Sequence, residues 1–107
     1  MAALWERYKG AMVARLAVIE DASRRLLEGA LADEDRQRAH GEAHKLAGSI
    51  GTFGYLEASR LARQIEELLV PGSPLSEQEA TQLAELVDQL GREVSSSTAQ
   101  PPSTMNP

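Results

Sequence analysis

Apolar residues recur at intervals of three and four along four separate segments of this 107-residue chain. This spacing places them on one face of an α-helix, because each residue advances the helix by about 100°. The pattern predicts helices over residues 3–30, 33–52, 55–70 and 76–94. Four amphipathic helices with short connections favour an all-α fold, an antiparallel up-down four-helix bundle.

The expected helix ends rest on capping and helix-breaking residues. Asp33 is expected to cap the start of the second helix, and Gly54 to end it in the left-handed conformation. Residues 71–74, with the sequence PGSP, predict a turn after the third helix. Ser76 and Glu79 have the spacing of a capping box that opens the fourth helix. The first helix is longer than its partners, so its first turns should extend past the bundle or cap its end.

Composition is consistent with one globular domain, since 42% of the residues are hydrophobic and 25% are charged. Residues 1–94 are expected to form the bundle. Residues 95–107 are rich in Ser, Thr and Pro, which predicts a disordered linker or tail and indicates a longer multidomain chain. The predicted core consists of large apolar residues from all four helices: Leu16, Leu46, Ile50, Phe53, Leu61, Ile65, Leu83 and Leu90.

Charge and cysteine content exclude several classes of function. The formal net charge is −5, which disfavours binding to nucleic acid. The chain has no cysteine, so neither disulfides nor thiolate metal sites can form, and this fits a cytoplasmic location. No apolar run approaches the ~18 residues needed to cross a membrane, and the first residues lack the pattern of a signal peptide.

His44 falls on the face of the second predicted helix that lies away from the apolar stripe. Gly41, Gly48 and Gly51 surround it on this outer face. Each glycine inside a helix costs about 1 kcal/mol relative to alanine, so three of them are hard to justify by folding alone. They would leave room for a large partner to reach the imidazole. The pattern indicates a nucleophilic histidine that serves another protein, and tight helix packing is the alternative explanation for the glycines.

The segment that begins at His44 resembles the signature of the histidine phosphotransfer (HPt) domain family. In that signature the histidine is followed by an apolar residue, a glycine, a small residue and a second glycine at two, four, five and ten positions. The matching residues are Leu46, Gly48, Ser49 and Gly54, and the resemblance covers most of residues 4–94.

The resemblance implies a role in a two-component phosphorelay. His44 would carry a phosphoryl group to or from an aspartate of a receiver domain, and imidazole can attack without a base because it is mostly neutral at pH 7. The implied partner is the receiver domain of a response regulator, or a hybrid histidine kinase. An HPt domain of this kind is a monomeric phosphocarrier that depends on its partner and is not an enzyme. It would have no cofactor or metal of its own, and Mg²⁺ would come from the receiver.

The chain departs from the family pattern at Ala47, because the family usually has a lysine three residues after the histidine. Lys45 and Arg63 are the nearest candidates to supply its positive charge. Gly48, Ser49, Gly41 and Gly51 are expected to support the phosphoryl group or to give access to it. The missing lysine leaves an alternative open, in which the bundle has lost phosphotransfer and acts as a docking module.

Two further alternatives come from the same stretch of sequence. His40 and His44 stand four residues apart and could share a metal, but the chain has no third histidine and Glu42 lies on another face. Residues 46–65 could form a helix-turn-helix that presents Arg60 and Arg63. The second helix of this pair also carries Glu57, Glu66 and Glu67, and the whole chain is acidic, which disfavours this interpretation.

Overall fold

The structure is a computed structural model that describes residues 2–72 and 74–99, with side chains over 6–72 and 74–96. These residues form four helices and no strand. The helices are α1 (Ala2–Leu27), α2 (Asp33–Thr52), α3 (Leu56–Leu68) and α4 (Glu77–Ala99). The predicted all-α class is therefore confirmed. No helix in these residues is long and apolar enough to cross a membrane.

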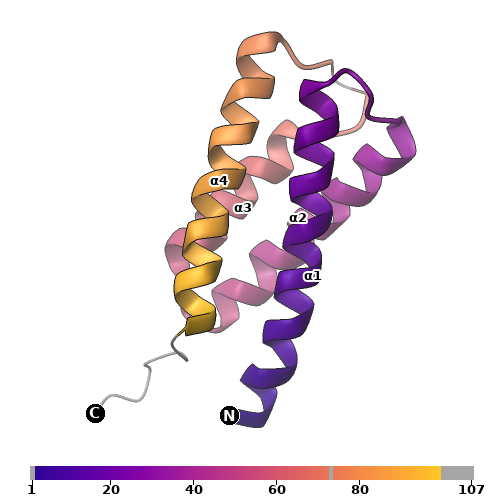
Figure 1. Ribbon diagram of the computed structural model, residues 1–107. Helices are drawn as coiled ribbons and strands as arrows, with labels where there is room; N and C mark the ends of the chain where they lie inside the picture. The colour runs from indigo at the N-terminus through magenta and orange to yellow at the C-terminus, as the bar shows by residue number, and fades with distance from the viewer. Residues whose placement is uncertain (1, 73, 100–107) are drawn as a thin grey trace.

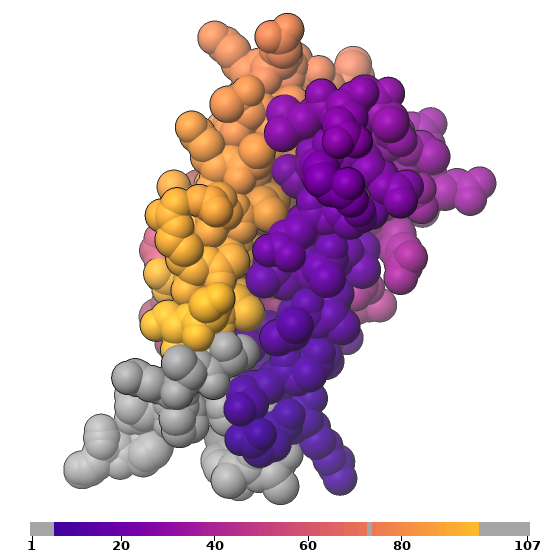
Figure 2. All heavy atoms as spheres, in the orientation of Figure 1, coloured from indigo at the N-terminus to yellow at the C-terminus, as the bar shows by residue number. Residues whose placement is uncertain are grey.

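The four helices form an up-down bundle in which each helix packs on its two neighbours (Figure 1). α2 contacts α1 and α3, and α4 contacts α3 and α1, so the ring of contacts is closed. Figure 2 shows the face on which α1 and α4 lie against each other. As expected from its length, α1 extends beyond the ends of the other helices, at the lower end of Figure 1.

The core is aliphatic, as the sequence predicts, and all but one of the predicted core residues are buried. The exception is Phe53, which is only partly buried. It follows the last turn of α2, at the edge of the bundle, and its ring stacks on Tyr8 of α1 with centroids 4.8 Å apart. The largest fully buried side chains are Met12, Ile19, Leu46, Ile50, Leu61, Ile65, Leu69, Leu83 and Leu90.

Two predicted helix ends are confirmed by their hydrogen bonds and dihedral angles. The backbone N–H of Glu79 donates to Oγ of Ser76 at 3.1 Å, and the N–H of Ser76 donates to Oε1 of Glu79 at 3.0 Å. These reciprocal bonds are a capping box. Gly54 follows α2 with φ +89°, a conformation that glycine adopts without the steric cost of a Cβ.

Two other predicted ends are wrong. The residue that precedes α2 is Ala32, whose carbonyl accepts the N–H of Arg36 at 2.9 Å, so Asp33 is the first helical residue and not the cap. α4 continues to Ala99, and the predicted tail over 95–107 therefore begins inside a helix. Serine and threonine cost only a few tenths of a kcal/mol when they extend an existing helix. The rest of the predicted tail, 100–107, lies outside the described residues.

Two buried polar contacts fix α3 against α2. The Arg36 guanidinium, on α2, donates to the carbonyls of Leu68 and Leu69 at 3.2 and 3.3 Å, which satisfies backbone groups at the end of α3. Near the other end of α3, Oγ of Ser59 donates to the carbonyl of Ala47 at 2.8 Å. The two helices are therefore held together on both sides of the turn that carries His44.

Candidate functional site

His44 projects from the middle of α2, and 72% of its side chain is exposed. Leu46 and Ile50, on the opposite side of the same helix, are fully buried. The amphipathic pattern that predicted an exposed His44 is therefore confirmed.

Glu66 of α3 holds one nitrogen of the His44 imidazole. Nδ1 of His44 lies 2.8 Å from Oε2 of Glu66, and 22% of the Glu66 side chain is exposed. An ionised carboxylate only accepts hydrogen bonds, so this contact assigns the proton to Nδ1. In the neutral ring the lone pair then belongs to Nε2, on the far side of the imidazole from Glu66. The arrangement leaves a nucleophilic nitrogen on the outer edge of the ring.

His40 approaches the same carboxylate from the preceding turn of α2. Its Nε2 lies 4.0 Å from Oε2 of Glu66, and 28% of its side chain is exposed. Glu42 does not join this group, since it contacts Arg15 of α1 at 3.6 Å and Lys45 at 3.5 Å. Across the described side chains, no group of three or more His, Cys, Asp and Glu is arranged to hold a metal ion.

The three glycines around His44 differ in their surroundings. A Cβ added at Gly41 or Gly48 would meet nothing within 4 Å, so the surface is open at both positions. A Cβ at Gly51 would lie 3.1 Å from Oγ of Ser59, because α3 approaches α2 closely at this turn. The expectation of open space thus holds for Gly41 and Gly48. At Gly51 the structure shows helix packing, which was the alternative explanation.

Ser49 lies on a different side of α2 from His44. Five residues along a helix correspond to a rotation of about 140°, and this rotation turns Ser49 toward α1. There its hydroxyl lies close enough to Tyr8 to lower the pKa of that side chain. Burial raises the pKa of Tyr8 to about 12, against the opposing effects of Ser49 and of the Arg15 charge. Ser49 therefore contributes to the packing of α1 on α2 and does not lie beside the imidazole.

The two candidate cations occupy different sides of the site. Lys45, with 59% of its side chain exposed, is paired with Glu42. Arg63 is exposed on α3, three residues before Glu66. α2 and α3 are antiparallel, and Glu66 meets His44 while Ser59 approaches Gly51, so Arg63 lies between these two contacts along α3.

Ala47 itself is only 1% exposed, at the α2–α3 interface. The position where the family pattern has a lysine is therefore covered by α3, whose Ser59 bonds to the Ala47 carbonyl. Arg60, the other cation of the helix-turn-helix alternative, is bound to Glu57, with Nε 3.0 Å from Oε1.

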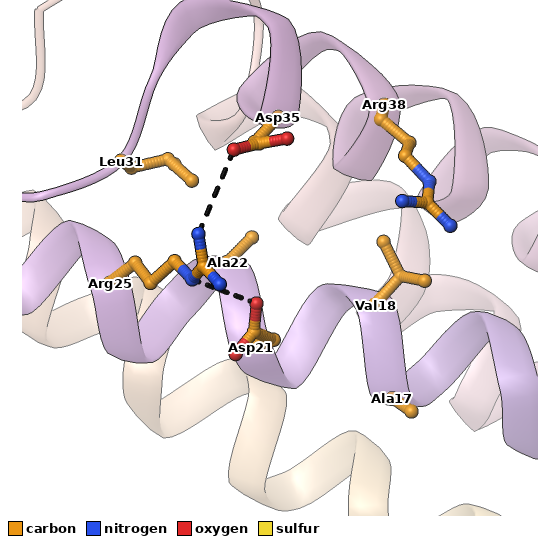
Figure 3. A pocket seen from close by; sticks show the side chains of 8 residues that line it. All are labelled: Ala17, Val18, Asp21, Ala22, Arg25, Leu31, Asp35 and Arg38. Carbon is orange, nitrogen blue, oxygen red and sulfur yellow. Dashed lines mark ion pairs between the residues drawn. The ribbon is translucent and has the colours of Figure 1, made fainter.

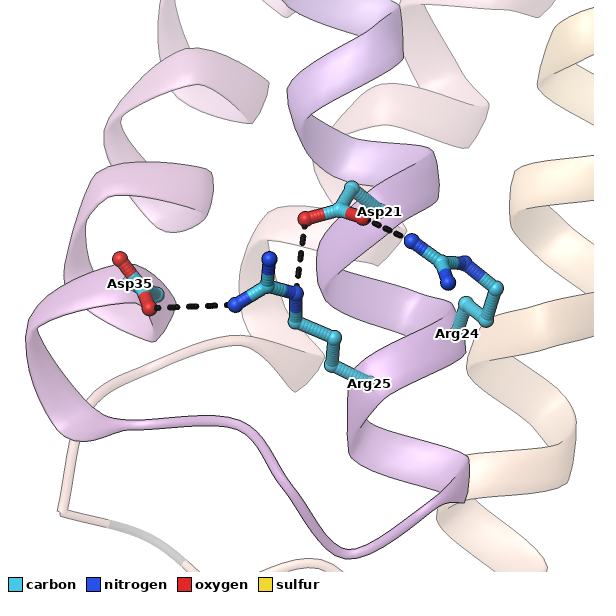
Figure 4. Close-up of polar contacts among 4 residues, drawn as sticks. All are labelled: Asp21, Arg24, Arg25 and Asp35. Atoms are coloured by element: carbon cyan, nitrogen blue, oxygen red, sulfur yellow. Dashed lines mark hydrogen bonds and ion pairs between the residues drawn. The ribbon is translucent and has the colours of Figure 1, made fainter.

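A second polar cluster joins α1 to the start of α2. Arg25 contacts Asp21 at 3.0 Å and Asp35 at 3.8 Å, and Arg24 also pairs with Asp21 (Figure 4). Figure 3 shows the adjoining pocket of about 290 Å³. Asp35 precedes His44 by nine residues, which is about 14 Å along the helix. The cluster fixes the ends of two helices and lies away from the imidazole.

Comparison with known proteins agrees with this geometry. The model of the Hpt domain family matches residues 3–93. The chain belongs to the Hpt domain family. It is 29% identical over 94 residues to Protein RcaC of Microchaete diplosiphon, a match that covers 88% of this chain and 14% of that protein. No solved structure gives a significant match. Hpt domains are in general phosphocarriers rather than enzymes, and the family works with receiver or kinase partners.

Glu66 is the site residue that sequence reasoning missed. In the sequence it counts only as an acidic residue that disfavours DNA binding. Its contact with His44 depends on how α3 is aligned with α2, and the spacing of 22 residues between them carries no periodic signal. The available clue was that Glu66 lies on the third predicted helix, which follows the His44 helix after a short turn and must pack against it.

Proposed function

We propose that this Hpt domain carries a phosphoryl group on Nε2 of His44, in exchange with an aspartate of a receiver domain. One observation supports the proposal most directly. His44 is exposed, and its Nδ1 is held at 2.8 Å by Glu66, so that Nε2 is the free nucleophile. A histidine that served only to pack helices would have no reason to be presented in this way.

In the proposed step, the Nε2 lone pair attacks the phosphorus of an aspartyl phosphate. The Nε2–P bond forms as the bond between phosphorus and the aspartate oxygen breaks, and the aspartate leaves as a carboxylate. The proton stays on Nδ1, so the phosphorylated ring becomes cationic, and the Glu66 carboxylate 2.8 Å away stabilises this charge. Transfer to a receiver aspartate is the same sequence in reverse.

In this scheme the chain supplies position, exposure and one carboxylate. Phosphoryl transfer depends mainly on alignment and charge stabilisation, so the remaining groups can belong to the partner. Mg²⁺ would be provided by the acidic pocket of the receiver. The open surface at Gly41 and Gly48 would admit the receiver to within reach of His44.

The context we propose is a cytoplasmic phosphorelay in which the chain is a monomeric domain of a longer protein. Its partner would be the receiver domain of a response regulator or a hybrid histidine kinase. The match to RcaC supports a multidomain context, because the chain spans 14% of the length of that relative.

The test is incubation with a phosphorylated receiver domain, followed by detection of acid-labile phosphate on this chain. We expect the wild type to be labelled and His44→Gln to be unlabelled. Helical circular dichroism should be the same for both, because the His44 side chain lies outside the core. Labelling of His44→Gln at the wild-type level would show that another residue is the acceptor.

A second candidate function is a docking module that binds receivers without accepting phosphate. Ala47 favours it, since the lysine of the family pattern is absent. The same experiment separates the two functions, because a docking module would bind the receiver in a pull-down assay and remain unlabelled.

A further inference from the structure

Two imidazoles lie close to one carboxylate oxygen in this structure. Oε2 of Glu66 lies 2.8 Å from Nδ1 of His44 and 4.0 Å from Nε2 of His40. The first distance is a hydrogen bond, whereas the second is an ion pair only when His40 is protonated. Because 22% of the Glu66 side chain is exposed, water screens these contacts only in part.

Within residues 6–72 and 74–96, Glu66 is the charged side chain that His40 contacts. On α2, Arg36 donates to the carbonyls at the end of α3, and His44 lies one turn onward. On α3, Glu67 and Arg63 are exposed neighbours of Glu66.

From α1, Arg15 contacts Glu42, which is rotated by about 200° from His40 and therefore lies on the opposite side of α2. A positive charge on His40 would therefore act mainly on the Glu66 carboxylate.

We propose that His40 is a positioning residue for phosphoryl acceptance, which controls how fully the Glu66 carboxylate is available to the Nδ1–H of His44. The inference rests on the proposed function of His44 and extends it. When His40 is neutral, Glu66 serves His44 alone. When His40 is protonated, its N–H draws the same oxygen and divides the carboxylate between two donors.

The direction of the effect follows from where charge develops. Attack by Nε2 makes the His44 ring cationic, and the negative charge of Glu66 stabilises that ring. A second cation on the same oxygen reduces this stabilisation and repels the ring. The transferred phosphoryl group is bonded to Nε2, on the far side of the ring. Its attraction to a protonated His40 is therefore weaker than the repulsion between His40 and the cationic ring. A protonated His40 therefore slows acceptance.

The first experiment compares three residues at position 40: histidine, glutamine and lysine. At pH 8 we expect His40→Gln to accept phosphate at close to the wild-type rate and His40→Lys to be slower by up to about fivefold, the upper limit for a partly exposed charge pair. As the pH is lowered from 8 to 6, protonation of His40 would slow wild type relative to His40→Gln by up to about fivefold. A constant ratio of wild type to His40→Gln across this pH range would overturn the proposal.

The matched control is Gln37→Lys, which adds the same charge to α2 one turn farther from His44. The added lysine should have the same long-range effect on receiver binding as His40→Lys, but it is too far along the helix to contact Glu66. We expect its rate to stay near that of the wild type. Equal slowing by Gln37→Lys and His40→Lys would mean that the effect is general electrostatics and that His40 has no special role.

A second measurement does not depend on phosphotransfer. The ¹⁵N resonances of the His44 ring report which nitrogen carries the proton. At pH 8 we expect the Nδ1–H form in the wild type and in His40→Gln, and a smaller share of it in His40→Lys. An unchanged tautomer in His40→Lys would overturn the inference even if His44 is phosphorylated. A changed tautomer in a chain that accepts no phosphate would instead refute the proposed function.

Discussion

At the scale of single residues, the contact between Glu66 and His44 makes the two ring nitrogens chemically different. A solvated imidazole exchanges its proton between Nδ1 and Nε2, but a carboxylate 2.8 Å from Nδ1 favours the form with its proton there. The exposed nitrogen is then the nucleophile for most of the time. In the proposed transfer Glu66 would help twice, by selecting the tautomer and by stabilising the cationic ring.

Replacing the Glu66 carboxylate by an amide separates these two effects. Glu66→Gln can still accept the Nδ1–H bond but carries no charge, so we expect the rate of phosphoryl acceptance to fall about fivefold, which is the difference between a charge-assisted and a neutral hydrogen bond. The rate for Glu66→Ala should fall further, because this variant also lacks the hydrogen-bond acceptor that favours the Nδ1–H tautomer. The measurement is single-turnover labelling from a phosphorylated receiver. Glu67→Gln, which removes the same charge from an exposed neighbour, should leave the rate unchanged, and equal losses in both variants would contradict this role.

Arg63 is expected to replace the lysine that the family pattern places at Ala47. Arg63→Ala should shift the transfer equilibrium away from phospho-His44 by about 1 kcal/mol, because an exposed cation near a dianion contributes no more than that. Arg63→Lys should keep part of the stabilisation of phospho-His44, and added salt should weaken that stabilisation. Lys45→Ala is the control, since Lys45 is already paired with Glu42 at 3.5 Å. The measurement is the equilibrium ratio of phosphorylated domain to phosphorylated receiver for each variant. A larger shift for Lys45→Ala than for Arg63→Ala would show that Lys45, and not Arg63, replaces the missing lysine.

At the scale of the helices, the sequence predicted those features that depend on residues close together along the chain. The capping box at Ser76 and the left-handed Gly54 follow from local hydrogen bonding and sterics, and the exposed His44 follows from helical periodicity. The alignment of α2 with α3 could not be predicted in this way, because it is fixed by contacts between residues far apart in sequence. The role of Glu66 and the packing of Gly51 against Ser59 both depend on that alignment.

The two glycines at Gly48 and Gly51 test this difference directly. Gly48→Ala should raise the free energy of unfolding by about 0.5–1 kcal/mol, since its Cβ would enter open space and only the helix propensity changes. Gly51→Ala should lower it by about 1 kcal/mol, because the new Cβ would displace the buried Ser59 hydroxyl from the Ala47 carbonyl and lose a bond worth more than the propensity gained. Chemical denaturation measures both values.

The interaction can be isolated with Ser59→Ala as the background. In that variant Gly51→Ala no longer meets a hydroxyl, so it should become neutral or stabilising. Destabilisation of equal size in both backgrounds would show that the clash is not with Ser59.

At the scale of the whole molecule, the long helix α1 is tied to α2 from one end to the other. Arg25 joins it to Asp35 near the α1–α2 connection, Arg15 joins it to Glu42, and Tyr8 stacks on Phe53 where α2 ends. The site on α2 is therefore held between α1 on one side and α3 on the other. Of the α1 contacts, the one made by Tyr8 reports on folding through its ionisation.

Burial raises the pKa of Tyr8 to about 12, from 10.0 for the free side chain. The unfolded chain therefore loses this proton at a lower pH than the folded chain does, and the folded state loses stability as the pH rises from about 10 to about 12. Below pH 10 this contribution is fully present. We expect it to be about 1 kcal/mol, less than the full shift would give, because Tyr8 is only half-buried and solvent screens the ionised form.

The measurement is the free energy of unfolding of wild type and Tyr8→Phe at a series of pH values from 8 to 12. Phenylalanine keeps the stacking on Phe53 but cannot ionise, so the wild type should lose more stability than Tyr8→Phe above pH 10. Other groups that titrate in this range act equally on both chains, and the difference between the two curves isolates Tyr8. Tyr55→Phe is the control for a more exposed tyrosine whose pKa burial raises less, and its curve should stay closer to that of the wild type. Parallel curves for wild type and Tyr8→Phe up to pH 12 would show that the Tyr8 hydroxyl is not buried in solution and that α1 is free of α2 at this end.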